Sequence, residues 1–241
     1  MAEEHVDSYY GASANSSHGR ESLQGDISCD VCVIGAGFTG LTVALELAEK
    51  GLDVVVLEAA WAAWGASGRN GGQICSGFSA DMDKIEGWVG TEDARRLWSM
   101  AEEGKAIIAE RVARHAIPCD LKYGYLYAAD RPKHRAWLAP MVRDWNETYG
   151  YDQARVVGRE ELRGLVRTDR YLGGVLDEGG GHLHPLNYAL GLATAAEAAG
   201  VRIFENSPVT AIDTGANPWA RTEAGRVRAK FLAIAANAYL G

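Results

Sequence analysis

The sequence predicts an α/β protein built around a parallel β-sheet, and three observations within residues 30 to 58 support this prediction. The stretch DVCVIGAGFTGLTVALELAEKGLDVVVLE begins with an apolar run that enters a glycine-rich turn. A segment with helical spacing of apolar residues follows, and a second apolar run, VVVL, ends in the acid Glu58. Strand, glycine turn, helix, strand and terminal acid in this order are the context that a dinucleotide-binding βαβ unit requires.

The chain opens with a polar segment, residues 1 to 27, which is predicted to form an extended arm. Tyr9 and Tyr10 within it are expected to contact the body of the protein. The segment carries acids and lacks an apolar stretch, which argues against a secretory signal and favours the cytoplasm. No run of about 18 apolar residues occurs, so the sequence predicts no membrane-spanning helix.

The three glycines of the turn match the pattern GxGxxG, and each has a physical role. Gly35 allows the tight turn, Gly37 lets a pyrophosphate approach the backbone, and Gly40 lets helix and strand pack closely. The anion would then meet free N–H groups at the helix N-terminus. Glu58 can accept hydrogen bonds from both hydroxyls of an adenosine ribose and would repel a 2′-phosphate, which disfavours NADP. The expected cofactor-binding residues of this unit are Gly35, Gly37, Phe38, Thr39, Gly40, Glu58 and Ala59.

The segment after Glu58 bears on the choice between a flavin and a nicotinamide cofactor. A nicotinamide-binding domain usually continues into another crossover helix and parallel strand, whereas this chain continues with AAWAAWGASGRNGGQICSG, which is dense in small residues. Such a segment offers N–H groups with little side-chain bulk and suits a second contact with a long cofactor. A flexible loop is the alternative, since Gly and Ser favour turns. The candidate residues are Ser67, Gly68, Arg69, Asn70, Gly71, Gly72 and Gln73.

The middle of the chain is expected to form a substrate domain inserted into the nucleotide-binding domain. A helix is predicted for residues 91 to 115, with a capping Thr, two acids in its first turn and Pro118 beyond its end. The alternation in LKYGYLYAA, residues 121 to 129, predicts a strand with three phenols on one face. That face could bind a cationic amine through cation–π contacts, but packing of the sheet on a helix is the favoured interpretation. A helix at residues 131 to 148 and a strand at 171 to 177 complete this part.

The C-terminal part is predicted to return to the nucleotide-binding sheet. Residues 185 to 199 begin with Pro and stop before Gly200, which marks both ends of a helix. Short strands are expected at residues 201 to 204, 208 to 213 and 231 to 236.

Two pairs of residues resemble metal or redox motifs. His182 and His184 would point to the same side of an extended segment, but no third ligand lies nearby in the sequence. We therefore expect no metal at these histidines. Cys29 and Cys32 form a nominal CxxC within the first strand, where positions three apart point to opposite faces. A redox role is disfavoured, because a reactive thiol normally needs a helix N-terminus.

The net charge of the chain indicates which classes of molecule it is expected to bind. The formal net charge is -8, from 32 acidic and 24 basic residues, and no Lys/Arg cluster interrupts it. Nucleic-acid binding is not expected, because neutralising phosphates needs a concentrated basic face. An acidic protein could attract a cationic amine through its long-range field, although solubility is the simpler explanation.

Several segments together resemble the FAD-dependent amine and amino-acid oxidoreductases of the D-amino-acid oxidase superfamily. Within it, the sequence is most similar to the gamma-glutamylputrescine oxidoreductases, and the resemblance covers nearly the whole chain. The segments that carry it are SYYGAS at 8 to 13, the nucleotide unit at 30 to 58, WGASGRNGGQ at 64 to 73, GGHLHPLNYALGLA at 180 to 193 and AIAANAYLG at 233 to 241.

The resemblance implies an FAD-binding, Rossmann-like domain of the glutathione-reductase type, with an inserted, partly antiparallel portion of a substrate domain. It further implies that Ser67 to Gln73 line the flavin and pyrophosphate, that Val209 meets the adenine through its backbone, and that Ala236 and Asn237 lie close to the cofactor. The same resemblance implies that the turn with His182 and His184 contacts the flavin or the substrate cavity. The implied divisions are an arm (1–27), a first part of the FAD-binding domain (28–118), a substrate-domain portion (119–180) and a second part of the FAD-binding domain (181–241).

The implied activity is oxidation of a small-molecule amine, with gamma-glutamylputrescine as the favoured substrate. Hydride transfer to non-covalent FAD would give an imine, which water hydrolyses to an aldehyde and ammonia, and hydrogen peroxide forms if oxygen is the acceptor. No catalytic acid or base is assigned, because the cofactor carries this chemistry. The family is nearly twice as long, so the chain is expected to be truncated at its C-terminus, with a missing half or an oligomeric partner. The alternatives are a catalytically incomplete nucleotide-binding fragment and an NAD-dependent dehydrogenase.

Overall fold

The computed structural model describes residues 5–15 and 19–239, and the chain forms two compact units. The chain passes from one unit to the other after Gly71, Ala113, Cys119 and Leu183, so each unit is assembled from separate segments. Unit 1 contains Met1–Gly71, Arg114–Cys119 and His184–Gly241, and unit 2 contains Gly72–Ala113 and Asp120–Leu183.

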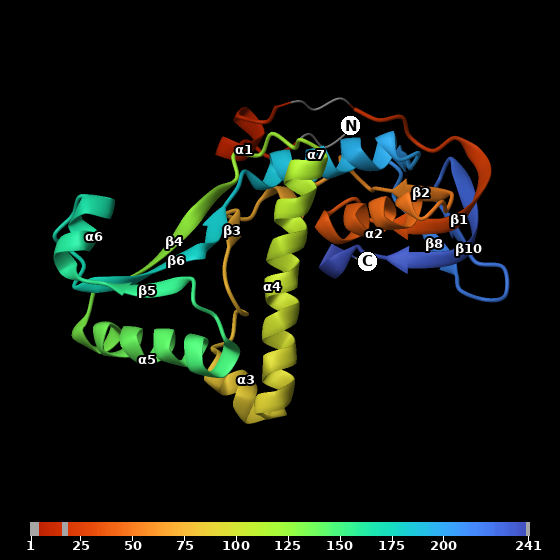
Figure 1. The fold of residues 1–241 in the computed structure, drawn as a ribbon. Helices are drawn as coiled ribbons and strands as arrows, with labels where there is room; N and C mark the ends of the chain where they lie inside the picture. Colours follow the sequence, from red (N-terminus) through yellow and green to blue (C-terminus); the bar gives the residue numbers. More distant parts are fainter. Residues whose placement is uncertain (1–4, 16–18, 240–241) are drawn as a thin grey trace. The chain divides into compact units, whose positions relative to one another are not determined.

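Unit 1 is built on a six-stranded mixed sheet (Figure 1). Its strands are β1 (Gly25–Ile34), β2 (Val54–Leu57), β7 (Arg202–Phe204), β8 (Ala211–Asp213), β9 (Trp219–Arg221) and β10 (Gly225–Ile234). They lie in the order β7-β2-β1-β10-β9-β8. The neighbouring strands β7, β2, β1 and β10 run parallel to one another. The strand β9 pairs antiparallel with β10, and β8 pairs antiparallel with β9. The predicted α/β class with a parallel central sheet is confirmed.

Two helices pack in unit 1 beside the central strands. The helix α2 (Phe38–Glu49) contacts β1 and β2, and α7 (Pro185–Ala198) contacts α2 and β7. All four residues of β2 are buried, which is typical of a parallel strand covered on both faces. Leu41 and Leu45 of α2 are almost fully removed from solvent. The strand, turn, helix and strand predicted for residues 30 to 58 are therefore all present.

The N-terminal arm is partly helical rather than extended throughout. Residues Tyr9–Ala12 form the short helix α1, because the Ser8 side chain accepts a hydrogen bond from the Gly11 N–H at 3.1 Å and caps its N-terminus. The expected contact of the arm with the body is confirmed for Tyr10, whose ring packs against His184 with 4.9 Å between centroids.

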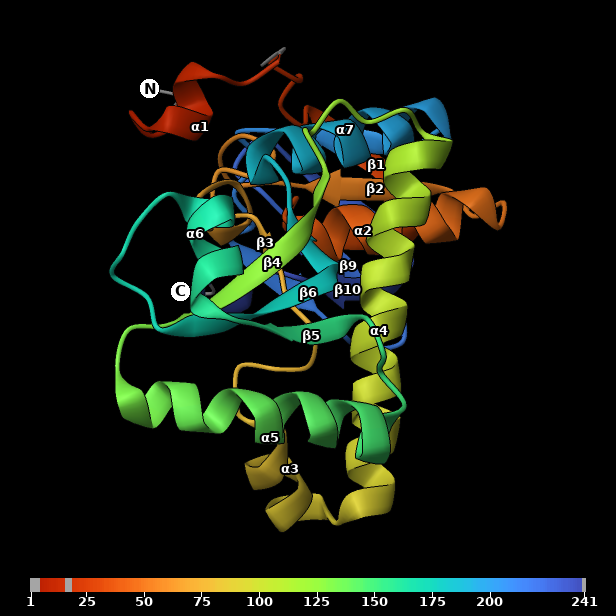
Figure 2. The same ribbon diagram turned by 60° about the vertical axis from the view of Figure 1, so that its left-hand side comes forward.

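Unit 2 contains a separate antiparallel sheet with four helices. Its strands are β3 (Gln73–Ile74), β4 (Lys122–Ala129), β5 (Ala154–Val157) and β6 (Gly173–His182), and β6 pairs with each of the other three. The helix α5 runs along one side of this sheet (Figure 2). The helices are α3 (Met82–Val89), α4 (Thr91–Arg114), α5 (Pro132–Tyr149) and α6 (Arg159–Val166).

A cluster of aromatic side chains forms the core of unit 2. The ring of Trp98 on α4 lies 5.3 Å from that of Trp145 on α5, and Tyr127 of β4 lies 5.9 Å from Trp145. The favoured interpretation of the tyrosine-rich strand, packing against a helix, therefore holds for Tyr127. Tyr123 is separated from the other tyrosines by a register shift and is 60% exposed.

A buried carboxylate, Asp177 of β6, supports the same unit. It accepts hydrogen bonds from the hydroxyls of Ser76 and Tyr151 and from the N–H groups of Gly179 and Gly180. Its side chain is fully buried, and these four donors compensate for the loss of water.

The unit boundaries differ from the predicted divisions. Residues 72 to 113 were expected in the first part of the nucleotide-binding domain, but they cluster with unit 2. The reason is the burial of Ala94 and Trp98 of α4 in the aromatic core of that unit. Residues 181 to 183 also belong to unit 2, since β6 continues to His182.

Candidate cofactor site

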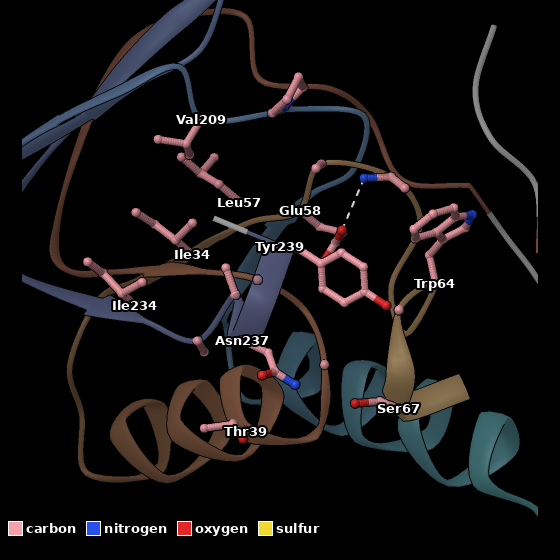
Figure 3. A pocket seen from close by; sticks show the side chains of 18 of the residues that line it. Ile34, Thr39, Leu57, Glu58, Trp64, Ser67, Val209, Ile234, Asn237 and Tyr239 are labelled. Atoms are coloured by element: carbon pink, nitrogen blue, oxygen red, sulfur yellow. Dashed lines mark hydrogen bonds between the residues drawn. The ribbon is translucent and has the colours of Figure 1, made fainter. Parts of the chain in front are cut away.

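A pocket of about 650 Å³ opens in unit 1 at the carboxyl ends of β1, β2 and β10 (Figure 3). This volume lies within the roughly 300 to 1,000 Å³ of small-molecule sites, and the carboxyl ends of parallel strands are where α/β sheets bind ligands. The aliphatic side chains of Ile34, Leu57 and Val209 gather on one side of the pocket, and the rings of Trp64 and Tyr239 lie on the other.

The glycine turn between β1 and α2 is sterically restricted to glycine. Gly35 has a φ of 103°, and a Cβ atom there would lie 2.8 Å from the carbonyl oxygen of Ala235. A Cβ atom at Gly40 would lie 1.8 Å from the carbonyl oxygen of Gly35. The backbone therefore folds back on itself as the GxGxxG pattern predicts.

The N-terminus of α2 borders the pocket without a charge of its own. Its N-cap, Gly37, has no side chain, and the first turn contains no acid. The N–H of Phe38 donates to the Ser67 Oγ at 2.9 Å, so the small-residue segment contacts this helix end. Because Gly37, Phe38 and Thr39 line the pocket, the positive end of the helix macrodipole is available to an anion there.

Glu58 lies at the end of β2 and is held by two backbone groups. One carboxylate oxygen accepts from the Ala36 N–H at 2.7 Å, and the other accepts from the Ala60 N–H at 3.0 Å. A carboxylate offers about four lone-pair sites, so two remain for hydroxyl donors in the pocket. The acid is thus fixed in direction before any ligand arrives.

The residues of the segment from Ser67 to Gln73 have different structural roles. Only Ser67 lines the pocket. The guanidinium of Arg69 stacks over the Trp64 ring at 4.0 Å and its Nε donates to the Trp64 carbonyl at 2.7 Å. The Asn70 amide donates to the carbonyls of Ala66 and Ser67, at 3.1 and 2.9 Å. Arg69 and Asn70 therefore fix the shape of the loop in this structure.

The sequence-predicted residues separate into two groups. Those that line the pocket are Gly35, Gly37, Phe38, Thr39, Glu58, Ala59, Ser67, Val209, Ala236 and Asn237. Those outside the pocket lining are Gly40 and Gly68, which allow close backbone packing, Arg69 and Asn70, and the residues Gly71, Gly72 and Gln73 at and beyond the unit boundary. Pocket residues that the sequence did not indicate include Trp64, Asn206, Pro208, Thr210 and Tyr239.

His184 has a structural role in unit 1. Its Nδ1 accepts from the Asn187 N–H at 3.1 Å and caps α7, and its Nε2 lies 3.1 Å from the Ser13 hydroxyl. It does not line this pocket, and its expected contact with the flavin or the substrate cavity stays a prediction. Among residues 5–15 and 19–239, no group of three or more His, Cys, Asp or Glu side chains is arranged to hold a metal ion.

The pocket, the turn and the fixed acid together define a dinucleotide-binding α/β protein. The chain belongs to the FAD dependent oxidoreductase family, which it matches over residues 30–241. This membership confirms the predicted class of cofactor, because the family depends on FAD. No helix in the part of the chain that the structure describes is long and apolar enough to cross a membrane.

Named relatives support the family assignment. The chain is 48% identical to the gamma-glutamylputrescine oxidoreductase of Escherichia coli (strain K12) over 238 residues. The matched region includes 99% of this chain and 56% of that protein. It is 41% identical to a probable oxidoreductase, OrdL, of Haemophilus influenzae, with the same coverage of 99% and 56%. The chain therefore spans about half the length of these curated relatives.

Solved structures show the same fold. An L-amino acid deaminase from Proteus myxofaciens superimposes with a TM-score of 0.74 at 25% identity, covering 92% of this chain and 48% of that one. A glycine oxidase from Geobacillus kaustophilus superimposes with a TM-score of 0.72 at 21% identity, covering 88% and 56%.

Proposed function

We propose that unit 1 binds FAD in the pocket at the ends of β1, β2 and β10, and that the protein oxidises a small-molecule amine. The observation that carries the cofactor proposal is the convergence on one pocket of a helix N-terminus whose N-cap has no side chain and of a fixed acid. The substrate proposal rests on the 48% identity to a gamma-glutamylputrescine oxidoreductase.

Three groups of residues divide the recognition of the adenosine diphosphate half. Gly37 and the first turn of α2 offer N–H groups to the pyrophosphate, and the hydroxyl of Ser67 retains its proton to donate while it accepts from Phe38. Glu58 accepts from the ribose hydroxyls. Among the described residues, no backbone hydrogen bond joins the N–H or C=O of Val209 to another element, which leaves both groups for the adenine edge.

The chemistry then depends on positioning rather than on a protein acid or base. When bound, FAD supplies the acceptor for a hydride from the carbon that bears the amine, and water converts the resulting imine to an aldehyde and ammonia. The residues of the chain hold the cofactor and exclude water from its apolar side. We further propose that unit 2 forms part of the substrate domain and that gamma-glutamylputrescine or a related amine is the substrate.

Binding is tested by titrating FAD into the purified chain and following visible absorbance and flavin fluorescence, with NAD as the comparison ligand. Saturable binding of FAD and none of NAD is the expected result. A chain that takes up NAD but not FAD would contradict the proposal and support a nicotinamide-dependent dehydrogenase.

Substrate class is tested separately on the FAD-loaded protein. Anaerobic addition of gamma-glutamylputrescine should bleach the flavin absorbance, and coupled peroxide detection in air then shows whether oxygen is the acceptor. Free putrescine is the comparison amine, since it lacks the acyl group. Bound flavin that stays oxidised with both amines would contradict the proposed substrate class without affecting the binding site.

A further inference from the structure

The N-terminal arm contacts the rest of unit 1 through an ion-pair network centred on Arg20. Its guanidinium forms a two-pronged contact with Glu197 of α7, with Nε–Oε1 at 2.7 Å and Nη2–Oε2 at 2.9 Å. The same guanidinium donates from Nη1 to Glu205 at 2.9 Å, and the backbone N–H of Arg20 donates to the other oxygen of Glu205 at 2.9 Å. The side chain of Glu205 is only 2% exposed, so Arg20 neutralises a buried carboxylate.

Glu205 also connects two loops that line the cofactor pocket. Its Oε1 accepts from the Ala62 N–H at 2.9 Å, in the loop that follows β2. The next residue, Asn206, lines the pocket with a φ of 50° and donates its N–H to the Ala60 carbonyl at 2.9 Å. Ser207 in turn donates its N–H to the carbonyl of Glu58 at 2.8 Å. The loop after β2 and the loop after β7 therefore meet at this carboxylate.

We propose that Arg20 is a positioning residue for the cofactor pocket, acting through Glu205 on the loops that hold Glu58 and Asn206. This inference rests on the proposed binding of FAD. A buried carboxylate that loses its cation must either find water or take up a proton. Turning toward water releases the Ala62 N–H, and the two loops lose their common anchor. The ribose-binding acid and the adenine-facing backbone then lose their fixed separation, which weakens binding of a ligand that must contact both.

The test compares Arg20→Met with Glu197→Gln by titration with FAD and with ADP. Glu197 is 39% exposed in its side chain and contacts Nε and Nη2 of the arginine rather than the Nη1 that reaches Glu205, so Glu197→Gln weakens the same network without removing a contact of the pocket loops. Arg20→Met is expected to raise the dissociation constant of both ligands about ten-fold, whereas Glu197→Gln should leave it within about two-fold of wild type. Arg20→Lys, which keeps a cation opposite Glu205, should recover part of the loss.

Hydrogen exchange without ligand separates this role from general stabilisation. Arg20→Met should speed exchange of the Ala62, Asn206 and Ser207 amides. Asn15→Ala, which removes a different contact of the arm, the hydrogen bond from the Asn15 side chain to the Pro118 carbonyl, should leave these amides protected even if it lowers the melting temperature. Unchanged protection in Arg20→Met would overturn the inference, and this readout stands whether or not the wild-type chain binds FAD.

A second variant covers the case in which Arg20→Met does not fold. The double variant Arg20→Met/Glu205→Gln removes both charges, so no unpaired charge stays buried. It is expected to fold and still to bind ADP and FAD about ten-fold more weakly than wild type, because a glutamine has one acceptor oxygen for the backbone N–H groups of Ala62 and residue 20 that Glu205 holds with two. A folded double variant with wild-type affinity for both ligands would overturn the inference.

Discussion

Replacing Glu58 with alanine is expected to weaken FAD binding by about 1 to 3 kcal/mol, or roughly 5- to 150-fold in the dissociation constant. The lower value corresponds to the loss of one hydrogen bond from a ribose hydroxyl to a charged acceptor. The upper value applies because the same carboxylate holds the N–H groups of Ala36 and Ala60 at 2.7 and 3.0 Å. Without it, Ala36 is released within the turn that must approach the pyrophosphate.

The assay is isothermal titration of FAD and of ADP into the wild-type chain, Glu58→Ala and Asp53→Ala. Asp53 is the matched control, because it precedes the same strand at the end away from the pocket and pairs with Arg202 at 2.8 Å. If Glu58 contacts the ribose, FAD and ADP should lose affinity by the same factor, since both carry that ribose. Asp53→Ala should bind both ligands like wild type.

Two results would refute the reasoning about Glu58. One is wild-type affinity for ADP in Glu58→Ala, which would show that the acid neither contacts the ribose nor supports the turn at the pyrophosphate. The other is an equal loss in Asp53→Ala, which would show that the effect comes from a weaker sheet rather than from a lost acceptor.

Three further predictions concern other parts of the chain. Gly37→Val should purify without bound flavin, because even a Cβ atom there would lie 2.9 Å from the Ser67 Oγ; full flavin occupancy in the absorbance spectrum would contradict this. Maleimide at pH 7 should label the exposed Cys75 before Cys29, because burial raises the pKa of Cys29 to about 11. Labelling of Cys29 should accelerate as the pH rises toward that value. Mass spectrometry that shows equal labelling rates for the two thiols would disprove this prediction. Asp177→Asn should lower the free energy of unfolding by roughly 2 to 5 kcal/mol in urea titrations, because an amide replaces a carboxylate that accepts four hydrogen bonds. A loss of unfolding free energy below about 0.5 kcal/mol would contradict this stabilising role of Asp177.

The nucleotide-binding unit could be predicted because its signals are local. Gly35 is favoured by its own φ of 103° and Gly40 by its contact with Gly35, and Glu58 follows directly from the end of a buried strand. The helix predicted for residues 91 to 115 is observed as Thr91–Arg114, since the acids of its first turn and Pro118 beyond its end are also local signals. The predicted cap is wrong, however, because Thr91 lies inside the helix and its hydroxyl donates to Glu86 rather than capping it.

Features that depend on distant contacts could not be predicted in the same way. The strand β10 begins at Gly225, but its first residues, GRVRAK, carry three cations and lack an apolar run, so only residues 231 to 236 were expected. Its extension depends on pairing with β1, far away in the sequence. Likewise, nothing near Trp98 reveals that it is buried against Trp145, in the core that α4 shares with the rest of unit 2.

The pairing of β1 with β10 also sets the order of events during synthesis. Gly25 pairs with Gly225 and Ile34 with Ile234, 200 positions along the chain in each case. At about 5 to 20 residues per second, a ribosome needs roughly 10 to 40 s to make the intervening chain. During that time β1 can pair with β2 on one edge, while its other edge remains an unpaired template for neighbouring chains. In the sequence, all of unit 2 falls between β1 and β10, so unit 2 has been synthesised before β10 can cover that edge of β1. The nucleotide-binding sheet therefore closes after unit 2 has been made, and in the interval before closure the free edge of β1 is exposed to aggregation.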